Sequence, residues 1–218
     1  MRALLAASLA ALVLAGTALA DPLDPKVAYN KADQASARAA VLVASVLGPG
    51  WAGSVSATPS SLKAPICPSL RPDYSKMTLT GHAESSFANG NGGVNVISDV
   101  EVWKTLQQAE QHMGALLQPA LPKCLKYSFL KTPGGSKLIL FPVKATKLGK
   151  FADVSVSYRE TIGVPSGGKV QSVISDFVLL RAGRTEIYLN VTAPSTSVDQ
   201  LTAFETRIAK ALVARVRA

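Results

Sequence analysis

A strict alternation of apolar and polar residues around an Asn-Gly turn places the strongest constraint on how this chain can fold. Residues 77–87 alternate in this way, and residues 94–103 do the same. A period of two is typical of strands that bury one face. The intervening segment, NGNGG at 89–93, contains the Asn-Gly steps of hairpin turns. The pattern predicts an antiparallel hairpin over 77–103, and it excludes a phosphate-binding glycine loop, which would lead into a helix.

The predicted hairpin brings His82 to a carboxylate in either of two registers. A four-residue turn over 89–92 pairs His82 with Asp99. A shorter turn pairs His82 with Glu101 and places Glu84 opposite Asp99. In both registers the neighbouring carboxylate favours the imidazolium, so we expect a raised pKa for His82.

The other periodicities predict a mixture of helices and strands. Helices are expected over 30–47, 105–117 and 198–217, with a short helical piece after Pro122, and an irregular loop over 54–75. Strands are expected over 138–143, 152–162, 170–180 and 185–193, with connections short enough for antiparallel pairing. The sequence therefore predicts an α+β fold: a mostly antiparallel sheet of five to six strands backed by helices, with α/β/α layering as one arrangement. No long linker divides residues 21–218, so one domain is expected.

The first twenty residues have the organisation of a secretory signal peptide. Arg2 precedes an apolar run that is too short to span a membrane, and Ala18-Leu19-Ala20 forms a small-x-small cleavage site. Cleavage after Ala20 would release a secreted, extracytoplasmic chain without a membrane span. No cysteine follows this site, so a lipid anchor is not expected.

Two cysteines, Cys67 and Cys124, remain in the predicted mature chain. In an oxidising compartment an even count predicts one disulfide. Two buried free thiols are the alternative. A metal pair is disfavoured because isolated cysteines lack the CxxC spacing of zinc ligands.

The predicted mature chain is basic. Without Arg2 it carries 22 Lys and Arg against 14 Asp and Glu, a net charge of about +8. Such a charge favours anionic partners, among them lipid surfaces and envelope polymers. The basic residues are scattered and form no aromatic-interleaved motif, so no nucleic acid is expected as a partner. A soluble basic monomer is the simplest interpretation, and adhesion to an anionic envelope polymer is an alternative.

The polar face of the hairpin is the first candidate for chemistry. His82, Glu84 and Asp99 are residue types that suit acid–base catalysis or metal binding. An ion pair on a solvated sheet face is the simpler interpretation. The sequence contains no GxSxG or HExxH motif, and His112 lies on a predicted helix without a partner at i+4. The sequence therefore predicts neither a catalytic site nor a metal site, and no cofactor.

The same face is also a candidate binding surface. Trp103 extends it beyond Glu101, the strand at 185–193 adds Glu186 and Tyr188, and Tyr158 is expected nearby. Aromatic side chains mixed with charges are typical of ligand platforms. They are also typical of the wet face of an antiparallel sheet, which a helix could cover.

Several stretches resemble a family of uncharacterised exported proteins from actinobacterial lineages: "VLVASVLGPGW", "CPSLRPDYSKMTLTGHAESSF", "SDVEVWKT", "LPKCLKY" and "RTEIYLNVTAP…ARVRA". The layout is more distantly similar to the extracytoplasmic sensor domains of PknH-type kinases and to PsbP-like mycobacterial envelope proteins. The resemblance implies an antiparallel sheet between helices and a cleft for an unidentified ligand, with binding rather than turnover. No functional residue is carried over from it.

Two functions are consistent with these features. The first is a non-catalytic binding or sensor-like protein of the cell envelope that presents a sheet face or cleft to a small molecule, lipid or polymer. The second is an exported hydrolase that uses His82 with Asp99 or Glu101.

Overall fold

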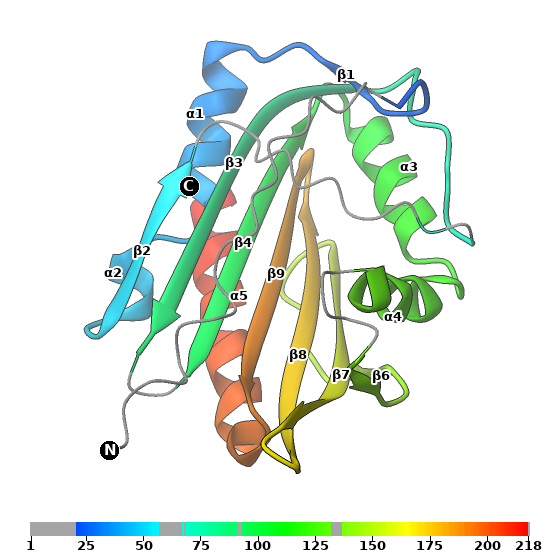
Figure 1. Cartoon of the computed structure of the whole chain (residues 1–218). Coiled ribbons are helices and arrows are strands. Elements are labelled where there is room, and N and C mark those ends of the chain that lie inside the picture. Colours follow the sequence, from blue (N-terminus) through cyan, green and yellow to red (C-terminus); the bar gives the residue numbers. More distant parts are fainter. Residues whose placement is uncertain (1–20, 57–66, 68, 91–92, 132–136, 218) are drawn as a thin grey trace.

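The computed structural model describes residues 21–56, 67, 69–90, 93–131 and 137–217. The predicted signal peptide, residues 1–20, lies outside them. The described chain forms one large sheet with helices against both faces (Figure 1). No helix within these residues combines the length and the apolar character needed to cross a membrane.

The sheet has nine strands and is antiparallel except where β1 meets β3. Its main order is β1 (Lys26–Val27), β3 (Thr78–Asn89), β4 (Val94–Trp103), β9 (Thr185–Pro194), β8 (Lys169–Ala182), β7 (Val154–Ser166) and β5 (Ile139–Leu140). Two more strands extend the edges: β2 (Trp51–Ser56) pairs with β3, and β6 (Lys144–Thr146) pairs with β7. The α+β class is confirmed. The strands outnumber the expected five to six because the short edge segments β1, β2 and β6 were not predicted, whereas β5 lies within the strand expected over 138–143.

Helices form a layer on each face. The helices α1 (Lys31–Ala40), α2 (Ala44–Leu47) and α5 (Val198–Arg217) pack on one face and enclose the main hydrophobic core. Figure 1 shows α5 running behind β4, β9 and β8. On the other face, α3 (Leu106–Leu116) and α4 (Leu121–Lys131) bury a smaller cluster around Met113, Leu121 and Leu179. The second layer is narrower, so part of that face stays open: Ile97 is 39% exposed.

The hairpin between β3 and β4 adopts one of the two predicted registers. Glu84 pairs with Asp99 and His82 pairs with Glu101. The backbone of Gly93, at φ 62°, closes the turn with a hydrogen bond of 3.0 Å from its N–H to the Asn89 carbonyl. Because one face of each strand is buried, a shift by one residue would expose the apolar side chains. The two predicted registers differ by two residues and bury the same faces, so the geometry of the turn selects between them.

The first predicted helix, 30–47, is interrupted, which corrects that prediction. The helix α1 ends at Ala40, and Val41 is extended at φ −66° and ψ 150°. Val41 and Leu42 are fully buried in the main core. The β-branched Val41 and Val43 have low helix propensity, so burial of the chain in an extended form outweighs continuation of the helix. Arg215 of α5 donates a hydrogen bond of 3.1 Å to the freed Val41 carbonyl.

The predicted loop over 54–75 is also corrected at its start. Residues Trp51–Ser56 form β2, which pairs in register with residues 84–89 of β3. Gly53 permits this pairing, because a Cβ at this position would lie 2.0 Å from the Ser86 carbonyl oxygen. Trp51 stacks on Phe204 of α5 at 5.4 Å between ring centroids. Residues 57–66 and 68 of the predicted loop lie outside the described residues.

A disulfide joins Cys67 to Cys124, which confirms the predicted pairing. Cys67 precedes β3 and Cys124 lies on α4, and both side chains are buried. The bond therefore ties the segment before β3 to the second helical layer.

A buried polar network holds α5 against β7 and β8. Arg159 donates a hydrogen bond of 2.8 Å from Nε to Asp176 Oδ1, and one of 3.2 Å from Nη2 to Thr202 on α5. Glu205, one turn further along α5, is 1% exposed. Burial and a hydrogen bond with Asp176 raise the pKa of Glu205 to about 9. A protonated Glu205 therefore donates to the Asp176 carboxylate, which already accepts from Arg159.

Candidate polar binding site

Six of the predicted site residues form two adjacent rows across β3, β4 and β9. In one row, Glu101 of β4 lies between His82 of β3 and Glu186 of β9. In the next row, Asp99 lies between Glu84 and Tyr188. Directly opposed residues on antiparallel strands point to the same face, so the six side chains share one side of the sheet.

Helix α3 covers one end of these rows and brings His112 onto them. The Nδ1 atom of His112 lies 2.6 Å from Glu186 Oε2 and 4.0 Å from Glu101 Oε2. The hydroxyl of Tyr188 donates to Glu186 Oε2 and lies 3.2 Å from His112 Nδ1. We call Glu101, His112, Glu186 and Tyr188 the polar cluster. The polar cluster joins β4, α3 and β9. His112 lies 74 residues before Glu186 and 76 residues before Tyr188.

The protonation of the polar cluster reflects its burial. Burial lowers the pKa of His112, but the hydrogen bond with Glu186 and the charges of Glu101 and Glu186 outweigh it, so the pKa is raised. Burial raises the pKa of Glu101 to about 7, aided by the charges of Asp99 and Glu186 and opposed by His112. Burial beside Glu186 and Glu101 also raises the pKa of Tyr188. The cluster therefore holds protons that the same groups would release in water.

Aromatic side chains surround His112. The Tyr74 ring lies 4.6 Å and the Trp103 ring 4.5 Å from the imidazole, centroid to centroid. Trp103 packs with the partly buried Tyr29 and Tyr74 in a small apolar cluster beside α3. These rings fix the plane of the imidazole and keep it against the carboxylates.

Several buried polar atoms around His112 have no hydrogen-bond partner within the described part of the chain. They are Glu186 Oε1, Trp103 Nε1, Tyr74 Oη and Tyr29 Oη. Buried polar atoms in folded proteins are bonded in the great majority of cases. The number of unpartnered buried polar atoms around His112 therefore indicates that a ligand or water can form further hydrogen bonds here.

His82 forms a second, separate contact on the same face. Its Nε2 lies 2.9 Å from Asp99 Oδ1, and its side chain is 7% exposed. Burial lowers the pKa of His82, but the interaction with Asp99 and the charges of Glu101 and Glu84 raise it overall, as predicted. His82 Nδ1 has no hydrogen-bond partner among the described residues, so the described chain supplies no serine in position for activation by this histidine.

The burial of the remaining predicted residues differs from that of a surface platform. Trp103 and Glu186 are both 0% exposed, because α3 covers this end of the sheet. Tyr158 lies on β7, where it packs with Met113 and Leu179 beside the polar cluster. The question of whether a helix covers the face is thus answered: α3 covers the end near Trp103, and the end near the β3–β4 turn is open.

His112 is the main residue that sequence reasoning missed. It was discounted for lacking a partner on its own helix, whereas its partners lie on β4 and β9. One sequence signal was available. His112 lies next to Met113 and three residues after Ala109, so it shares the buried stripe of α3 with these two residues. A histidine in a buried stripe requires polar partners from another element.

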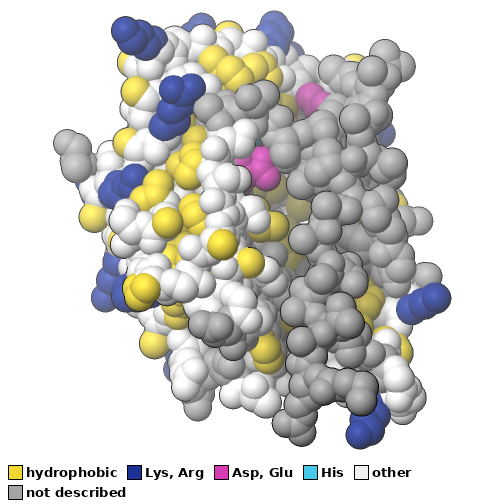
Figure 2. All heavy atoms as spheres, turned by 60° about the vertical axis from the view of Figure 1, so that its left-hand side comes forward, with side chains coloured by type: hydrophobic (Ala, Val, Ile, Leu, Met, Phe, Trp, Pro, Cys, Tyr) yellow, Lys and Arg dark blue, Asp and Glu magenta, His cyan; other side chains and the backbone are white. Residues whose placement is uncertain are grey.

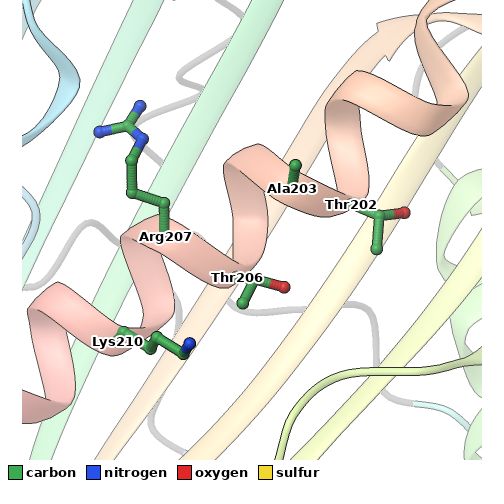
Figure 3. A pocket seen from close by; sticks show the side chains of 5 residues that line it. All are labelled: Thr202, Ala203, Thr206, Arg207 and Lys210. Atoms are coloured by element: carbon green, nitrogen blue, oxygen red, sulfur yellow. The ribbon is translucent and has the colours of Figure 1, made fainter.

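Two cavities on the other side of the sheet are weaker candidates. One, of about 710 Å³, lies along α5, and Figure 3 shows its five side chains spread along this single helix: Thr202, Ala203, Thr206, Arg207 and Lys210. Arg207 is already engaged, since it donates a hydrogen bond of 2.7 Å to the Val46 carbonyl. The other, of about 510 Å³, lies beside Asp33 and Arg184, which form an ion pair of 2.7 Å. Neither gathers unpartnered polar atoms as the polar cluster does.

The basic charge is not concentrated over the face seen in Figure 2. There the described Lys and Arg side chains stand apart from one another, most of them near the outline, and on the described part of the face neutral and hydrophobic surface lies between them. This agrees with the scattered basic residues of the sequence.

No known protein family matches the sequence, and no curated protein matches it significantly. Two solved structures have a weakly similar fold. An uncharacterised protein from Mycobacterium smegmatis, the Rv0999 ortholog, is 13% identical, with 85% of this chain and 98% of that chain covered and a TM-score of 0.42. LpqN of Mycobacterium tuberculosis, described as involved in cell envelope biogenesis, is 12% identical, with 74% and 82% covered and a TM-score of 0.33. Likeness at this level assigns neither family nor function. The resemblance to kinase sensor domains and to PsbP-like proteins stays a prediction.

Proposed function

We propose that this chain is a non-catalytic, extracytoplasmic binding protein of the cell envelope, and that its ligand binds at the polar cluster. The observation that carries the proposal is the convergence of two carboxylates, an imidazole and a phenol with several unpartnered buried polar atoms. A small ligand with polar groups could satisfy those atoms. The predicted signal peptide and the disulfide support an extracytoplasmic location.

Access to the cluster supports binding rather than a purely structural role. The Glu101 side chain is 22% exposed, while the His112 side chain is 11% and the Glu186 side chain 0% exposed. Solvent thus reaches the cluster at Glu101 of β4, whereas His112 of α3 and Glu186 of β9 are buried. A few convergent polar groups set among apolar and aromatic side chains are typical of small-molecule sites.

A hydrolase is the less favoured function. It requires a nucleophile activated by a histidine, with a third group that orients the histidine. The pair of His82 and Asp99 supplies the last two. No described hydroxyl group is hydrogen-bonded to either ring nitrogen of His82, so we do not assign it a catalytic role.

Native mass spectrometry of residues 21–218, purified after export from a related host, tests the proposal. We expect an adduct that dissociates on activation. Tyr188→Phe and Glu101→Gln should each reduce the fraction carrying it, because the first removes a hydroxyl and the second a carboxylate charge of the cluster with little change in shape. Gln111→Ala, an exposed change on α3 next to His112, is the matched control and should retain the adduct. An adduct that persists in both cluster variants would refute the proposed site.

A further inference from the structure

We propose that Glu101, His112 and Glu186 together bind a divalent first-row transition-metal ion, with zinc as the best match. The inference rests on the proposed binding function and names the class of ligand. It departs from the sequence, which predicted no metal site, because the three residues lie on β4, α3 and β9 and share no local motif.

The spacing of the donor atoms suits a single ion. One donor atom from each of the three residues can be chosen so that all lie within 4.8 Å of one another. Zinc bonds of 2.0–2.2 Å to nitrogen and oxygen place tetrahedral ligand atoms about 3.3 Å apart. The contacts of His112 Nδ1 at 2.6 Å with Glu186 and 4.0 Å with Glu101 bracket this value. Movements of about 1 Å of the two carboxylates would complete the site.

The donor types select the class of ion. Calcium and magnesium prefer sites built from oxygen alone, and calcium takes six to eight ligands. An imidazole nitrogen with two carboxylates suits zinc and its first-row neighbours. The Tyr188 hydroxyl, which already contacts Glu186 Oε2, adds a nearby oxygen. A coordination position on the partly exposed Glu101 side is left for water or a second ligand.

The charges around the site also favour a cation. Glu101 and Glu186 form no salt bridge with any described Lys or Arg, although the chain as a whole carries an excess of basic residues. Arg181, which pairs with Glu186 across β8 and β9, instead has its guanidinium nitrogens 3.7 Å from Glu110 and 3.6 Å from Asp153. Two carboxylates are therefore gathered without a fixed arginine or lysine counter-charge.

Two further observations point to a ligand at this position. Glu186 Oε1 is buried without a hydrogen-bond partner in the described chain, and it belongs to a side chain that is 0% exposed. A metal ion could use this oxygen by binding Glu186 through both of its oxygens. The rings of Tyr74 and Trp103 pack against the imidazole and hold its plane, and a side chain locked by packing is a pre-oriented ligand.

The two histidines of the chain make the experiment specific. Chelator-treated protein of residues 21–218 would be titrated with Zn²⁺ while the imidazole ¹⁵N resonances of both histidines are followed by NMR. We expect saturation at one equivalent, with large shifts for His112 Nδ1 and small ones for His82. This readout uses the unmodified chain, so it does not depend on how well a variant folds. Shifts confined to His82, or no shift at either histidine, would overturn the inference.

Calorimetric titration with Zn²⁺ gives the second measurement. Loss of one donor should weaken affinity by at least about tenfold in Glu101→Gln and in His112→Gln, since even loss of an outer contact costs ten- to a hundredfold. His82→Gln is the matched control, because it removes the other histidine on the same face, and its affinity should be unchanged. Equal weakening in His82→Gln and His112→Gln would refute the assignment. If Zn²⁺ fails to bind but the cluster-dependent adduct is present, only the metal inference fails; if both are absent, the proposed function fails as well.

Discussion

Replacement of Glu205 by glutamine should stabilise the protein by an amount that grows with pH. Glu205 lies on α5 with 1% exposure, against Asp176, which is fully buried. Burial and the Asp176 carboxylate raise its pKa from the ordinary 4.5 to about 9. Folded protein therefore keeps this proton across a range in which unfolded protein releases it. The proton contributes stability below the unfolded-state pKa, and this stability is lost as the pH rises towards the folded-state pKa.

The size of the effect at neutral pH depends mainly on the unfolded-state pKa. As long as the folded-state pKa of Glu205 lies above 7, the stability that wild type loses by pH 7 depends on the difference between pH 7 and 4.5, the ordinary pKa of this residue. At about 1.4 kcal/mol per pH unit, this is about 3 kcal/mol at pH 7 and about 1 kcal/mol at pH 5. Glutamine cannot ionise, and its amide can still donate to Asp176, so the variant avoids the cost.

Urea unfolding of both proteins at a series of pH values from 5 to 8 gives the free energies of unfolding. The difference between Glu205→Gln and wild type should grow by about 2–3 kcal/mol between pH 5 and pH 7. Effects of other titrating groups cancel in this difference. Glu110→Gln, on an exposed side chain of α3, serves as control for a Glu-to-Gln change at a carboxylate that solvent reaches. A Glu205→Gln difference that is constant with pH would show that Glu205 is ionised in the folded protein and would refute the reasoning.

Three further changes test how the fold is held together. Replacing Cys67 and Cys124 by serine should cost about 4 kcal/mol in urea unfolding, because the disulfide spans 57 residues; a loss below about 1 kcal/mol would contradict the chain-entropy estimate. Gly81→Ala should cost about 1–3 kcal/mol in thermal unfolding, since its Cβ would lie 2.3 Å from the Asp33 carbonyl oxygen; an unchanged Tm would show that α1 can move away. A hydrogen bond from Arg184 lowers the pKa of Asp33 to about 2, so stability is present above the ordinary 3.8 and is lost as the pH falls towards 2. Because the Arg184 side chain is 40% exposed, solvent screening reduces this contribution to about 1 kcal/mol. In unfolding experiments at decreasing pH, Asp33→Asn should lack this part of the loss of stability. A loss equal to that of wild type would count against the ion pair.

The hairpin shows what the sequence can predict well. Alternation along β3 and β4 identified both strands, and the pairing of His82 with Glu101 was one of two stated registers. Local pattern suffices here because a side chain's face follows from its position along the strand. The stripe of α5 was predictable for the same reason, with the period of a helix.

The missed features depend on contacts between distant segments. Two partners of His112, Glu186 and Tyr188, lie on β9, which the chain reaches only after α4 and the strands β5 to β8, so no local pattern indicates these contacts. The end of α1 at Ala40 depends on the burial of Val41 and Leu42 under α5. The strand β2 has a glycine- and serine-rich sequence, WAGSVS, which is strand-forming only because β3 offers it an edge.

The position of α5 determines when the chain can complete its fold during synthesis. Arg207 and Arg215 of α5 donate hydrogen bonds to Val46 and Val41, which lie 161 and 174 residues earlier. Until Val198–Arg217 is available, the apolar face of the sheet lacks α5, the long helix that packs along it. We expect a chain truncated before Val198 to leave this sheet face exposed to chaperones, proteases or other copies. The main core is complete only when α5 packs beside α1.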